Sequence, residues 1–371
     1  MKLFDLHCDT AFEIFKEKTS LFENSHDISV SRAEKTFDSY AQVMAIWTNR
    51  RKNDEECFRD FLLMRENLLC EAEKCGARIC LCGNDVLAAW KDGKSALFIA
   101  VEGARILCGD IDRVDMLYDL GVRFMTLTWG GSDIIGGSHD TDAPLTEFGR
   151  EAVRKCMKKG IIVDVSHASR AVTRECLDIA KEEEKPIIAT HSDSYFLNPI
   201  GRNLTDGEAV GISSLGGIIG ISLAPEHLCK DKNAGIDDII AHVKHYISLG
   251  LSGSVCFGCD FDGIASKPRG INDISSLKDV YYAFLEAGIP QDTVDDIFYR
   301  NAERFVLENL PFFQERYAKE PTFLERKVGN RTFAPITPFY FDGKLLRFQR
   351  TFHEKSFVSG LGAYSPNLPF L

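Results

Sequence analysis

The chain has 371 residues, 44% hydrophobic and 27% charged, a balance typical of a soluble globular protein with one large barrel or two domains. Its formal net charge of -11 argues against nucleic acid and anionic membrane surfaces as partners. No apolar run approaches the length of a membrane span, and Met1-Lys2 leads directly into the first predicted strand. We therefore expect a cytoplasmic protein with no targeting segment.

Apolar runs of strand length recur along the chain, with helical patterns between most of them. The predicted strands cover residues 3–7, 41–47, 96–101, 122–127, 161–165, 186–190, 217–222 and 254–258. The predicted helices cover residues 55–74, 112–120, 146–159, 171–184, 237–249, 275–286 and 291–307. Strands that are apolar throughout indicate a parallel sheet covered on both faces. Eight strand–helix units over about 300 residues predict an α/β fold, a TIM (β/α)8 barrel.

The competing architecture is an open, doubly wound sheet. That architecture predicts a Gly-rich phosphate-binding turn after the first strand. The sequence has His7-Cys8-Asp9-Thr10 there instead, which favours the barrel.

A barrel carries its catalytic residues at the C-terminal ends of its strands. His7 and Asp9 stand two residues apart at the end of the first strand, so both side chains point to one side while Cys8 faces away. Glu102 ends the third strand, and His167 and His191 follow the fifth and sixth. We expect one metal ion on His7 and Asp9 and a second on the two later histidines.

Glu102 completes this hypothesis if it bridges the two ions. Two divalent ions about 3.5–4 Å apart can hold a shared hydroxide, polarise a carbonyl and stabilise a tetrahedral intermediate. The sequence therefore predicts two zinc ions per chain, with other divalent metals as alternatives.

A second group of metal-type residues comprises Cys70, Cys75, Cys80 and Cys82. Their spacing matches neither the usual zinc pairs nor the ferredoxin runs. We interpret them as reduced thiols rather than as a metal site.

Six motifs carry a resemblance to a known family. They are His7-Cys8-Asp9-Thr10, Val101-Glu102-Gly103, residues 164–169, residues 190–195, Arg202-Asn203 and residues 258–263. In this order they resemble the membrane (renal) dipeptidase family of dizinc barrel enzymes, and the similarity runs from residue 3 to about residue 308.

The resemblance implies specific roles. His7, Asp9, Glu102, His167 and His191 correspond to the zinc ligands, with Glu102 bridging. Arg202 corresponds to the arginine that binds the C-terminal carboxylate of the substrate, a task suited to a guanidinium fork. We expect Asn203 beside it to contribute to substrate binding as well.

The last motif supplies the acid–base group. Asp260 corresponds to the acidic residue used for proton transfer, which an aspartate beside two cations can perform within hydrogen-bond reach. Asp262 is interpreted as a loop-capping or supporting residue.

One position departs from the family pattern. Well-known members have a histidine after the fourth strand that is thought to stabilise the oxyanion, and this chain has Trp129. An indole N–H donates one hydrogen bond but takes no charge, so we expect Trp129 to contact substrate while the metals hold more of the oxyanion charge. His139, in the following Gly-rich loop, either reaches into the site or is a solvated loop residue.

The resemblance does not cover the C-terminal segment. Residues 311–371 contain ten of the 26 phenylalanines, and residues 339–348 predict a hairpin with an Asp342-Gly343 turn. We expect a hydrolase domain at 1–310 and a β-rich appendage at 311–371. The appendage either packs on its own barrel or forms a homodimer contact.

The function we expect is a zinc-dependent dipeptidase, in which a metal-bridging hydroxide attacks the peptide bond of a dipeptide. One alternative is a dizinc hydrolase of another small amide or a lactam. Another is a catalytically weak metal-binding scaffold, motivated by Trp129 in the histidine position.

Overall fold

The computed structural model describes residues 1–310 and four short strands at 327–328, 331–332, 339–341 and 344–346. The chain consists of two units, Met1–Glu320 and Pro321–Leu371. In the described part of the chain, no helix combines the length and the apolar character that a membrane crossing requires.

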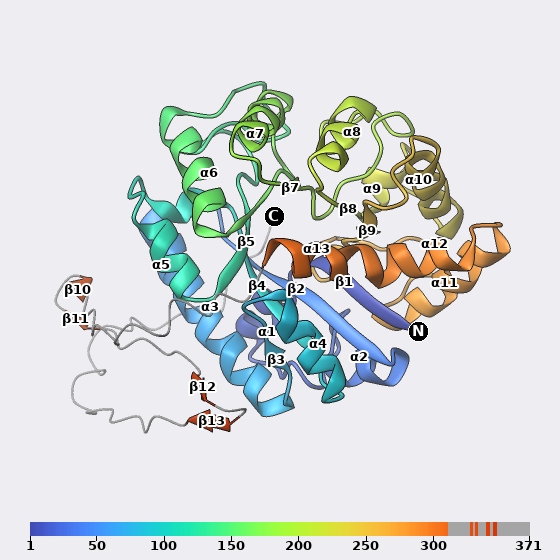
Figure 1. Ribbon diagram of the computed structural model, residues 1–371, viewed down its shortest axis with the longest axis horizontal. Coiled ribbons are helices and arrows are strands. Elements are labelled where there is room, and N and C mark those ends of the chain that lie inside the picture. The colour runs from blue at the N-terminus through green and yellow to red at the C-terminus, as the bar shows by residue number, and fades with distance from the viewer. Residues whose placement is uncertain (311–326, 329–330, 333–338, 342–343, 347–371) are drawn as a thin grey trace, which may run out of the picture. The chain divides into compact units, whose positions relative to one another are not determined.

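Within residues 1–310, eight parallel strands form a nearly closed barrel with helices around it (Figure 1). They are β1 (Lys2–Cys8), β2 (Ser39–Trp47), β4 (Ala96–Glu102), β5 (Val122–Thr126), β6 (Ile162–Asp164), β7 (Ile187–Ile188), β8 (Ile219–Ile221) and β9 (Val255–Phe257). Their order is β7-β6-β5-β4-β2-β1-β9-β8, and a parallel bridge between Ala189 and Ile219 joins the ends of this path. A further strand, β3 (Arg78–Ile79), pairs with β4 outside it. All eight predicted strands are present, and the predicted barrel is confirmed.

The helices lie between and after these strands. They are α1 (Thr10–Glu17), α2 (Val30–Thr36), α3 (Asp54–Cys75), α4 (Gly83–Lys91), α5 (Arg113–Asp119), α6 (Glu147–Lys159), α7 (Arg170–Glu182), α8 (Asp206–Ser214), α9 (Pro225–Leu228), α10 (Ile236–Ser248), α11 (Leu277–Glu286), α12 (Gln291–Asp295) and α13 (Asn301–Asn309). Short 3-10 turns cover Ala104–Leu107 and Ile274–Ser276, and a π-turn at Asp296–Arg300 links α12 to α13. The sequence patterns missed α1, α2, α4, α8 and α9.

Local chemistry explains several helix boundaries. The Thr146 side chain accepts a hydrogen bond from the Gly149 N–H at the start of α6, and Gly160 ends this helix with a left-handed backbone at φ 96°. Ser169 caps α7 in the same way through the Val172 N–H. These caps place the loops that precede α6 and α7 at the mouth of the barrel.

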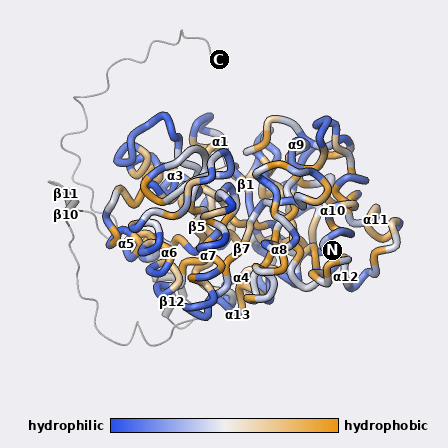
Figure 2. Tube along the Cα trace, turned by 90° about the horizontal axis from the view of Figure 1, so that it is seen from above, coloured by the Kyte–Doolittle hydropathy of each residue, from blue (hydrophilic) through white to orange (hydrophobic). Residues whose placement is uncertain are grey.

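Buried side chains form two apolar layers. One fills the space between strands and helices, and the other joins residues such as Phe4, Phe98 and Phe124 inside the barrel to side chains of α4 and α13. Figure 2 shows apolar stretches alternating with polar ones along the chain, as expected when one face of each helix packs against the sheet.

Strand β1 departs from strict alternation. Its pairing with β2 shifts register between Asp5 and Cys8. Phe4 and Leu6 point into the barrel, and the shift lets His7 also face inward while Cys8 packs outward against Met44. Irregularities of this kind re-aim side chains next to active sites.

The second unit contains two described hairpins. Strand β10 (Lys327–Val328) pairs antiparallel with β11 (Arg331–Thr332), and β12 (Phe339–Phe341) with β13 (Lys344–Leu346). The second pair is the hairpin predicted from the sequence. Its Asp342-Gly343 turn and most of the predicted appendage lie outside the described residues.

Candidate metal centre

The first two predicted ligands come from the end of β1. The His7 Nε2 lies 3.8 Å from the Asp9 Oδ2. The backbone N–H of Asp9 donates to the carbonyl of Phe261, which ties this end of β1 to the loop after β9. Both side chains therefore face the mouth of the barrel from one strand.

Glu102, the last residue of β4, lies at the centre of the group. Its Oε1 is 3.7 Å from the His7 Nε2, 3.0 Å from the His167 Nε2 and 3.6 Å from the His191 Nε2. One carboxylate oxygen thus reaches both predicted halves of the site, the geometry that a bridging ligand requires. We call these four side chains, together with Asp9, the cup.

His167 and His191 follow β6 and β7, and their Nε2 atoms lie 2.9 Å apart. The Nδ1 of His167 faces the Trp129 carbonyl at 3.1 Å, and the Nδ1 of His191 faces the Thr190 hydroxyl at 2.7 Å. An Nδ1 that faces an acceptor carries the proton, which leaves a lone pair on each Nε2. Two facing lone pairs repel each other unless a cation lies against them, which makes this pair of rings a candidate metal-binding pair.

Buried polar atoms without partners also indicate that a cation binds here. The His7 Nε2, Asp9 Oδ1 and Glu102 Oε2 are buried and have no hydrogen-bond partner among the described residues. Buried polar atoms are normally satisfied by hydrogen bonds or by a metal. Ligand atoms fall into three overlapping groups, each within 4.8 Å: His7, Asp9 and Glu102; Glu102, His167 and His191; and His7, His191 and Asp260. Imidazole and carboxylate donors suit zinc and related divalent ions.

The charged surroundings differ between the two sides of the cup, with His7 on one side and His167 and His191 on the other. Burial opposes protonation of His7, but the carboxylates of Glu102, Asp9 and Asp260 raise its pKa to about 10. Burial, with Arg202 as a further positive neighbour, lowers the pKa values of His167 and His191 well below their usual range. Burial and the Asp9 carboxylate raise the pKa of Glu102. The carboxylates therefore draw positive charge to the His7 side.

A buried network supports the ligands from behind. The Thr190 hydroxyl donates to the Asp164 Oδ2 at 2.6 Å, which leaves its oxygen to accept from His191; it also lies 3.4 Å from the His7 Nδ1. The Asp164 Oδ2 also accepts from the Thr126 hydroxyl, and its Oδ1 accepts from the backbone of Thr190. Partners of this kind orient ligand imidazoles.

The predicted acid–base residue lies beside the cup. The Asp260 Oδ1 is 3.8 Å from the His7 Nε2, and burial raises the pKa of Asp260 to about 7. Its backbone is left-handed at φ 62°, as is that of His167 at φ 66°. Such conformations cost free energy and concentrate at functional sites.

Gly263 allows this close approach. A Cβ at this position would lie 2.1 Å from the Asp9 Oδ2 and 2.5 Å from the Asp260 Oδ1. Asp262, the neighbouring carboxylate, instead accepts hydrogen bonds from the Thr10 hydroxyl and the Asp27 N–H. These contacts agree with a supporting role for Asp262.

Comparison with known proteins identifies the family. A sequence model described as membrane dipeptidase (peptidase family M19) matches residues 1–318. The chain belongs to this family.

Relatives and solved structures are consistent with this membership. The chain is 32% identical over 236 residues to dipeptidase tcpJ of Claviceps purpurea, covering 61% of this chain and 53% of that protein. It is 31% identical over 216 residues to an uncharacterized dipeptidase, C965.12, of Schizosaccharomyces pombe, covering 55% and 51%. The chain thus spans about half the length of the curated relatives it matches.

Two crystal structures share the fold. One is a metallopeptidase called dipeptidase AC, with a TM-score of 0.77, 23% identity, and coverage of 84% of this chain and 99% of that one. The other is a metallopeptidase from Rhodobacter sphaeroides bound to a phosphinate mimic of L-Ala-D-Ala, with a TM-score of 0.77, 22% identity, and coverage of 83% and 99%. Their similarity shows that this chain has the same barrel fold.

The two predicted substrate residues of the β7–α8 loop differ in their contacts. The buried Arg202 donates through Nη2 to the His191 carbonyl at 3.3 Å, while its Nη1 has no partner among the residues described. The Asn203 Nδ2 donates to the carbonyls of Asn198 and His227, at 2.9 and 2.8 Å. Asn203 therefore holds the loop, and its contact with substrate stays a prediction.

Trp129 occupies the position where the dipeptidase family pattern has a histidine. Its ring packs edge-on against Trp47 at 5.2 Å and lies 6.0 Å from the His167 ring. Its carbonyl orients His167, a contact that any residue at this position can provide. The side chain lies next to the cup and lines a pocket beside it.

The sequence left undecided whether His139 reaches the site or is a solvated loop residue. The His139 ring lies 5.6 Å from the His167 ring, its N–H donates to the His167 carbonyl, and burial together with Arg202 lowers its pKa to about 4. His139 therefore reaches the cup. His227 is buried, and its Nδ1 lies 3.1 Å from the Ser222 hydroxyl. In the described residues, the cysteines of the 70–82 segment form no metal-type cluster.

Proposed function

We propose that the chain is a zinc-dependent dipeptidase that cleaves the peptide bond of dipeptides. The observation that carries this proposal is the convergence of three imidazoles, those of His7, His167 and His191, on the Glu102 Oε1, with unpaired ligand atoms on the His7 side of it. Membership of the membrane dipeptidase family supports it.

The residues of the chain divide the work of hydrolysis. When bound, two divalent cations lower the pKa of a water molecule and polarise a carbonyl. His7 and Asp9 would hold one cation, His167 and His191 the other, and Glu102 both. Asp260, beside His7, takes a proton from the attacking water and returns it to the leaving amine.

Arg202 selects the substrate. Its Nη1 has no partner among the described residues, and a buried guanidinium with free donors suits the C-terminal carboxylate of a dipeptide. A peptide with further residues on the C-terminal side has no free carboxylate at this distance from the scissile bond, so Arg202 restricts cleavage to the last peptide bond of a substrate.

Metal content and substrate range test the proposal together. Purified protein loaded with zinc is expected to contain two equivalents by mass spectrometry and to release amino acids from a panel of dipeptides, including L,D-pairs. Metal-loaded protein that cleaves no member of the panel contradicts the proposal.

Trp129 motivates two alternatives, a hydrolase of another small amide or lactam and a catalytically weak scaffold. Dipeptides amidated at the C-terminus separate the first, because a dipeptidase loses activity on them and a general amidase does not. Tight zinc binding without turnover would indicate the second. The position of the His139 ring near the cup argues against a weakened site.

A homodimer and a cytoplasmic location remain predictions from the sequence. Light scattering of the full chain tests the first, since a dimer has twice the 41.5 kDa mass of one chain. Cell fractionation tests the second.

A further inference from the structure

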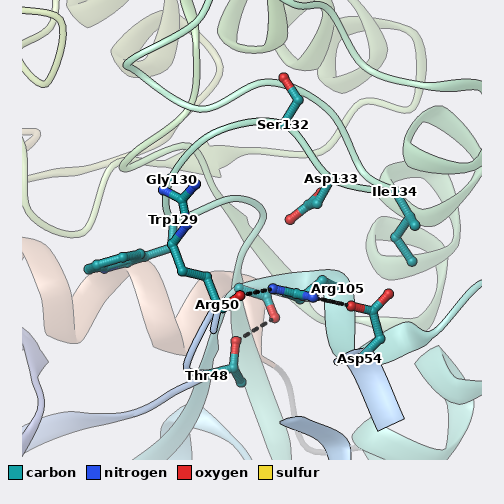
Figure 3. Close-up of a pocket in the computed structure, with 10 residues that line it drawn as sticks. Thr48, Arg50, Asp54, Arg105, Trp129, Gly130, Ser132, Asp133 and Ile134 are labelled. Carbon is teal, nitrogen blue, oxygen red and sulfur yellow. Dashed lines mark hydrogen bonds and ion pairs between the residues drawn. The ribbon is translucent and has the colours of Figure 1, made fainter. Parts of the chain in front are cut away.

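A pocket of about 320 Å³ lies beside the cup (Figure 3). Its lining includes Gly103, which follows the central ligand Glu102, and Trp129, whose carbonyl orients His167. Thr48 at its base donates to the Glu102 carbonyl. The volume is at the small end for ligand pockets and suits one amino-acid side chain.

Arg105 builds one wall of this pocket without remaining free to bind. Its Nε donates to the Asp54 carboxylate at 2.7 Å, and its Nη1 donates to the Arg50 carbonyl at 3.2 Å (Figure 3). Its Nη2 donates to the Lys52 carbonyl at 3.1 Å. These contacts hold the loop between β2 and α3 in place. The Asp54 carboxylate therefore balances the charge of Arg105, and each nitrogen of the Arg105 guanidinium already donates a hydrogen bond.

Arg50 is the cation of the pocket that remains available. Its guanidinium makes no ion pair or hydrogen bond with another described residue. It lies against the backbone of Gly130 and Gly131, where a Cβ would come within 2.7 Å of Nη1 and 2.9 Å of Nη2. Two glycines therefore make room for the guanidinium along the pocket wall.

Asp133 is the remaining carboxylate of the lining. Its Oδ1 accepts a hydrogen bond from the Ile135 N–H at 2.8 Å, and burial raises its pKa. It forms no ion pair with Arg50 within 4 Å. Among the described residues that line the pocket, Arg50 therefore carries the one positive charge that no carboxylate pairs, and an anionic group that enters the pocket meets this charge.

The strand order places Arg50 opposite Arg202. Around the barrel the strands run β1, β2, β4, β5, β6, β7, β8 and β9. Arg50 follows β2 and Arg202 follows β7, so the two loops stand half a turn apart. A dipeptide whose C-terminal carboxylate binds Arg202 extends its N-terminal residue across the cup toward the Arg50 pocket.

We propose that this pocket receives the side chain of the N-terminal residue and that Arg50 selects an acidic one, glutamate or aspartate. The proposal rests on the dipeptidase function proposed above and names its substrate class. A guanidinium lying along the wall binds a carboxylate through two parallel hydrogen bonds, which a neutral amide of the same shape does not match.

Glu-Ala and Gln-Ala test it, because they differ in one charge and hardly in shape. We expect the zinc-loaded wild type to have a kcat/KM for Glu-Ala at least about tenfold above that for Gln-Ala. Arg50→Met should bring the two substrates to within about twofold of each other by lowering only the value for Glu-Ala. Arg50→Glu should reverse the preference, with Lys-Ala cleaved faster than Glu-Ala.

The neighbouring Arg51→Met is the matched control, since Arg51 is also exposed but does not line the pocket. It should keep the wild-type ratio, and equal metal content and melting temperature verify that all variants fold. Equal cleavage of Glu-Ala and Gln-Ala by the wild type, or a ratio that survives Arg50→Met, overturns the subsite alone. Absence of any dipeptide cleavage overturns the dipeptidase proposal, and the subsite with it.

Discussion

The two sides of the cup differ in the charges that surround them. On the β1 side, His7 faces the carboxylates of Asp9, Glu102 and Asp260, which raise its pKa to about 10. On the opposite side, burial and the positive charge of Arg202 lower the pKa values of His167 and His191. One side attracts cations, and the other keeps its imidazoles neutral and available beside a guanidinium.

This difference suggests a division of labour within one site. Under the proposed function, the carboxylate side would supply the negative charge that retains divalent ions and the aspartate that moves protons. The histidine side adjoins Arg202 and His139, so an anionic substrate group would be stabilised there without displacing the carboxylates of the other side. Glu102 belongs to both sides and couples them.

Glu102→Gln should therefore have the largest effect. The neutral amide removes the negative charge that both sides share, so we expect at most about one metal ion per chain and more than about a 1,000-fold loss of kcat/KM. Metal analysis and dipeptide assays measure both. Glu73→Gln, on the exposed face of α3, is the control and should change neither. Two retained ions would refute the bridging role.

Asp260→Asn separates proton transfer from metal binding on the carboxylate side. If Asp260 moves protons, the variant should retain its metal while kcat falls about 10²- to 10⁴-fold. Asp262→Asn, which alters a carboxylate bonded to Thr10 and Asp27, is the matched control and should affect kcat much less. Loss of one metal ion in Asp260→Asn would instead make this residue a ligand.

Arg202→Met tests the substrate-binding role of the histidine side. We expect kcat/KM for dipeptides to fall about 100-fold, mostly through KM, because a charge-assisted contact with the C-terminal carboxylate is lost. Residual activity on C-terminally amidated dipeptides should be unchanged. An equal loss on both substrate types would assign Arg202 to the structure of the β7–α8 loop instead.

Thr190→Val tests the hydrogen-bond network behind the histidines on both sides of the cup. The substitution preserves shape but removes the hydroxyl that links His191 to Asp164 and lies near His7. Zinc affinity, measured by competition with a chromophoric chelator, should fall about 10- to 100-fold. Thr126→Val removes a hydroxyl from the same Asp164 oxygen, but this hydroxyl makes no hydrogen bond to a predicted ligand, so the substitution should cost less. Equal effects would deny Thr190 a specific role.

The strands and the cup could be read from the sequence for related reasons. Buried parallel strands are continuous apolar runs, and polar residues directly after them must meet at one end of a barrel. The register shift in β1 and the left-handed backbones of His167 and Asp260 arise from contacts between distant segments, such as the hydrogen bond from the Asp260 N–H to the His7 carbonyl. No local pattern encodes such contacts.

The short helices and the loop positions could not be predicted from the sequence, because they also depend on contacts between distant segments. Helix α8 has a cap at Thr205 with Glu208 three residues on, a signal that was available, but its apolar residues form no clear face. The Arg50 pocket depends on three segments, which follow β2, β4 and β5, and Arg105 in the second of them holds the first in place.

A substitution of His139 is expected to have the smallest effect, and it tests the difference between the two sides of the cup most specifically. Its sequence context, a Gly-rich loop, does not distinguish a solvated histidine from one that reaches the cup. The Ser138 hydroxyl donates to the His167 carbonyl, the His139 N–H donates to the same oxygen, and together they bring the ring beside His167.

The His139→Gln variant should lower kcat about tenfold, less than the loss of a sole oxyanion donor, because cations held by the cup would share the developing charge. Metal content should stay constant, since His139 is absent from the three ligand groups. His245→Gln, which removes a histidine paired with Asp206, is the control. A change in KM without a change in kcat would place His139 in ground-state binding with Arg202 and would restrict the transition-state role to the cations and Asp260.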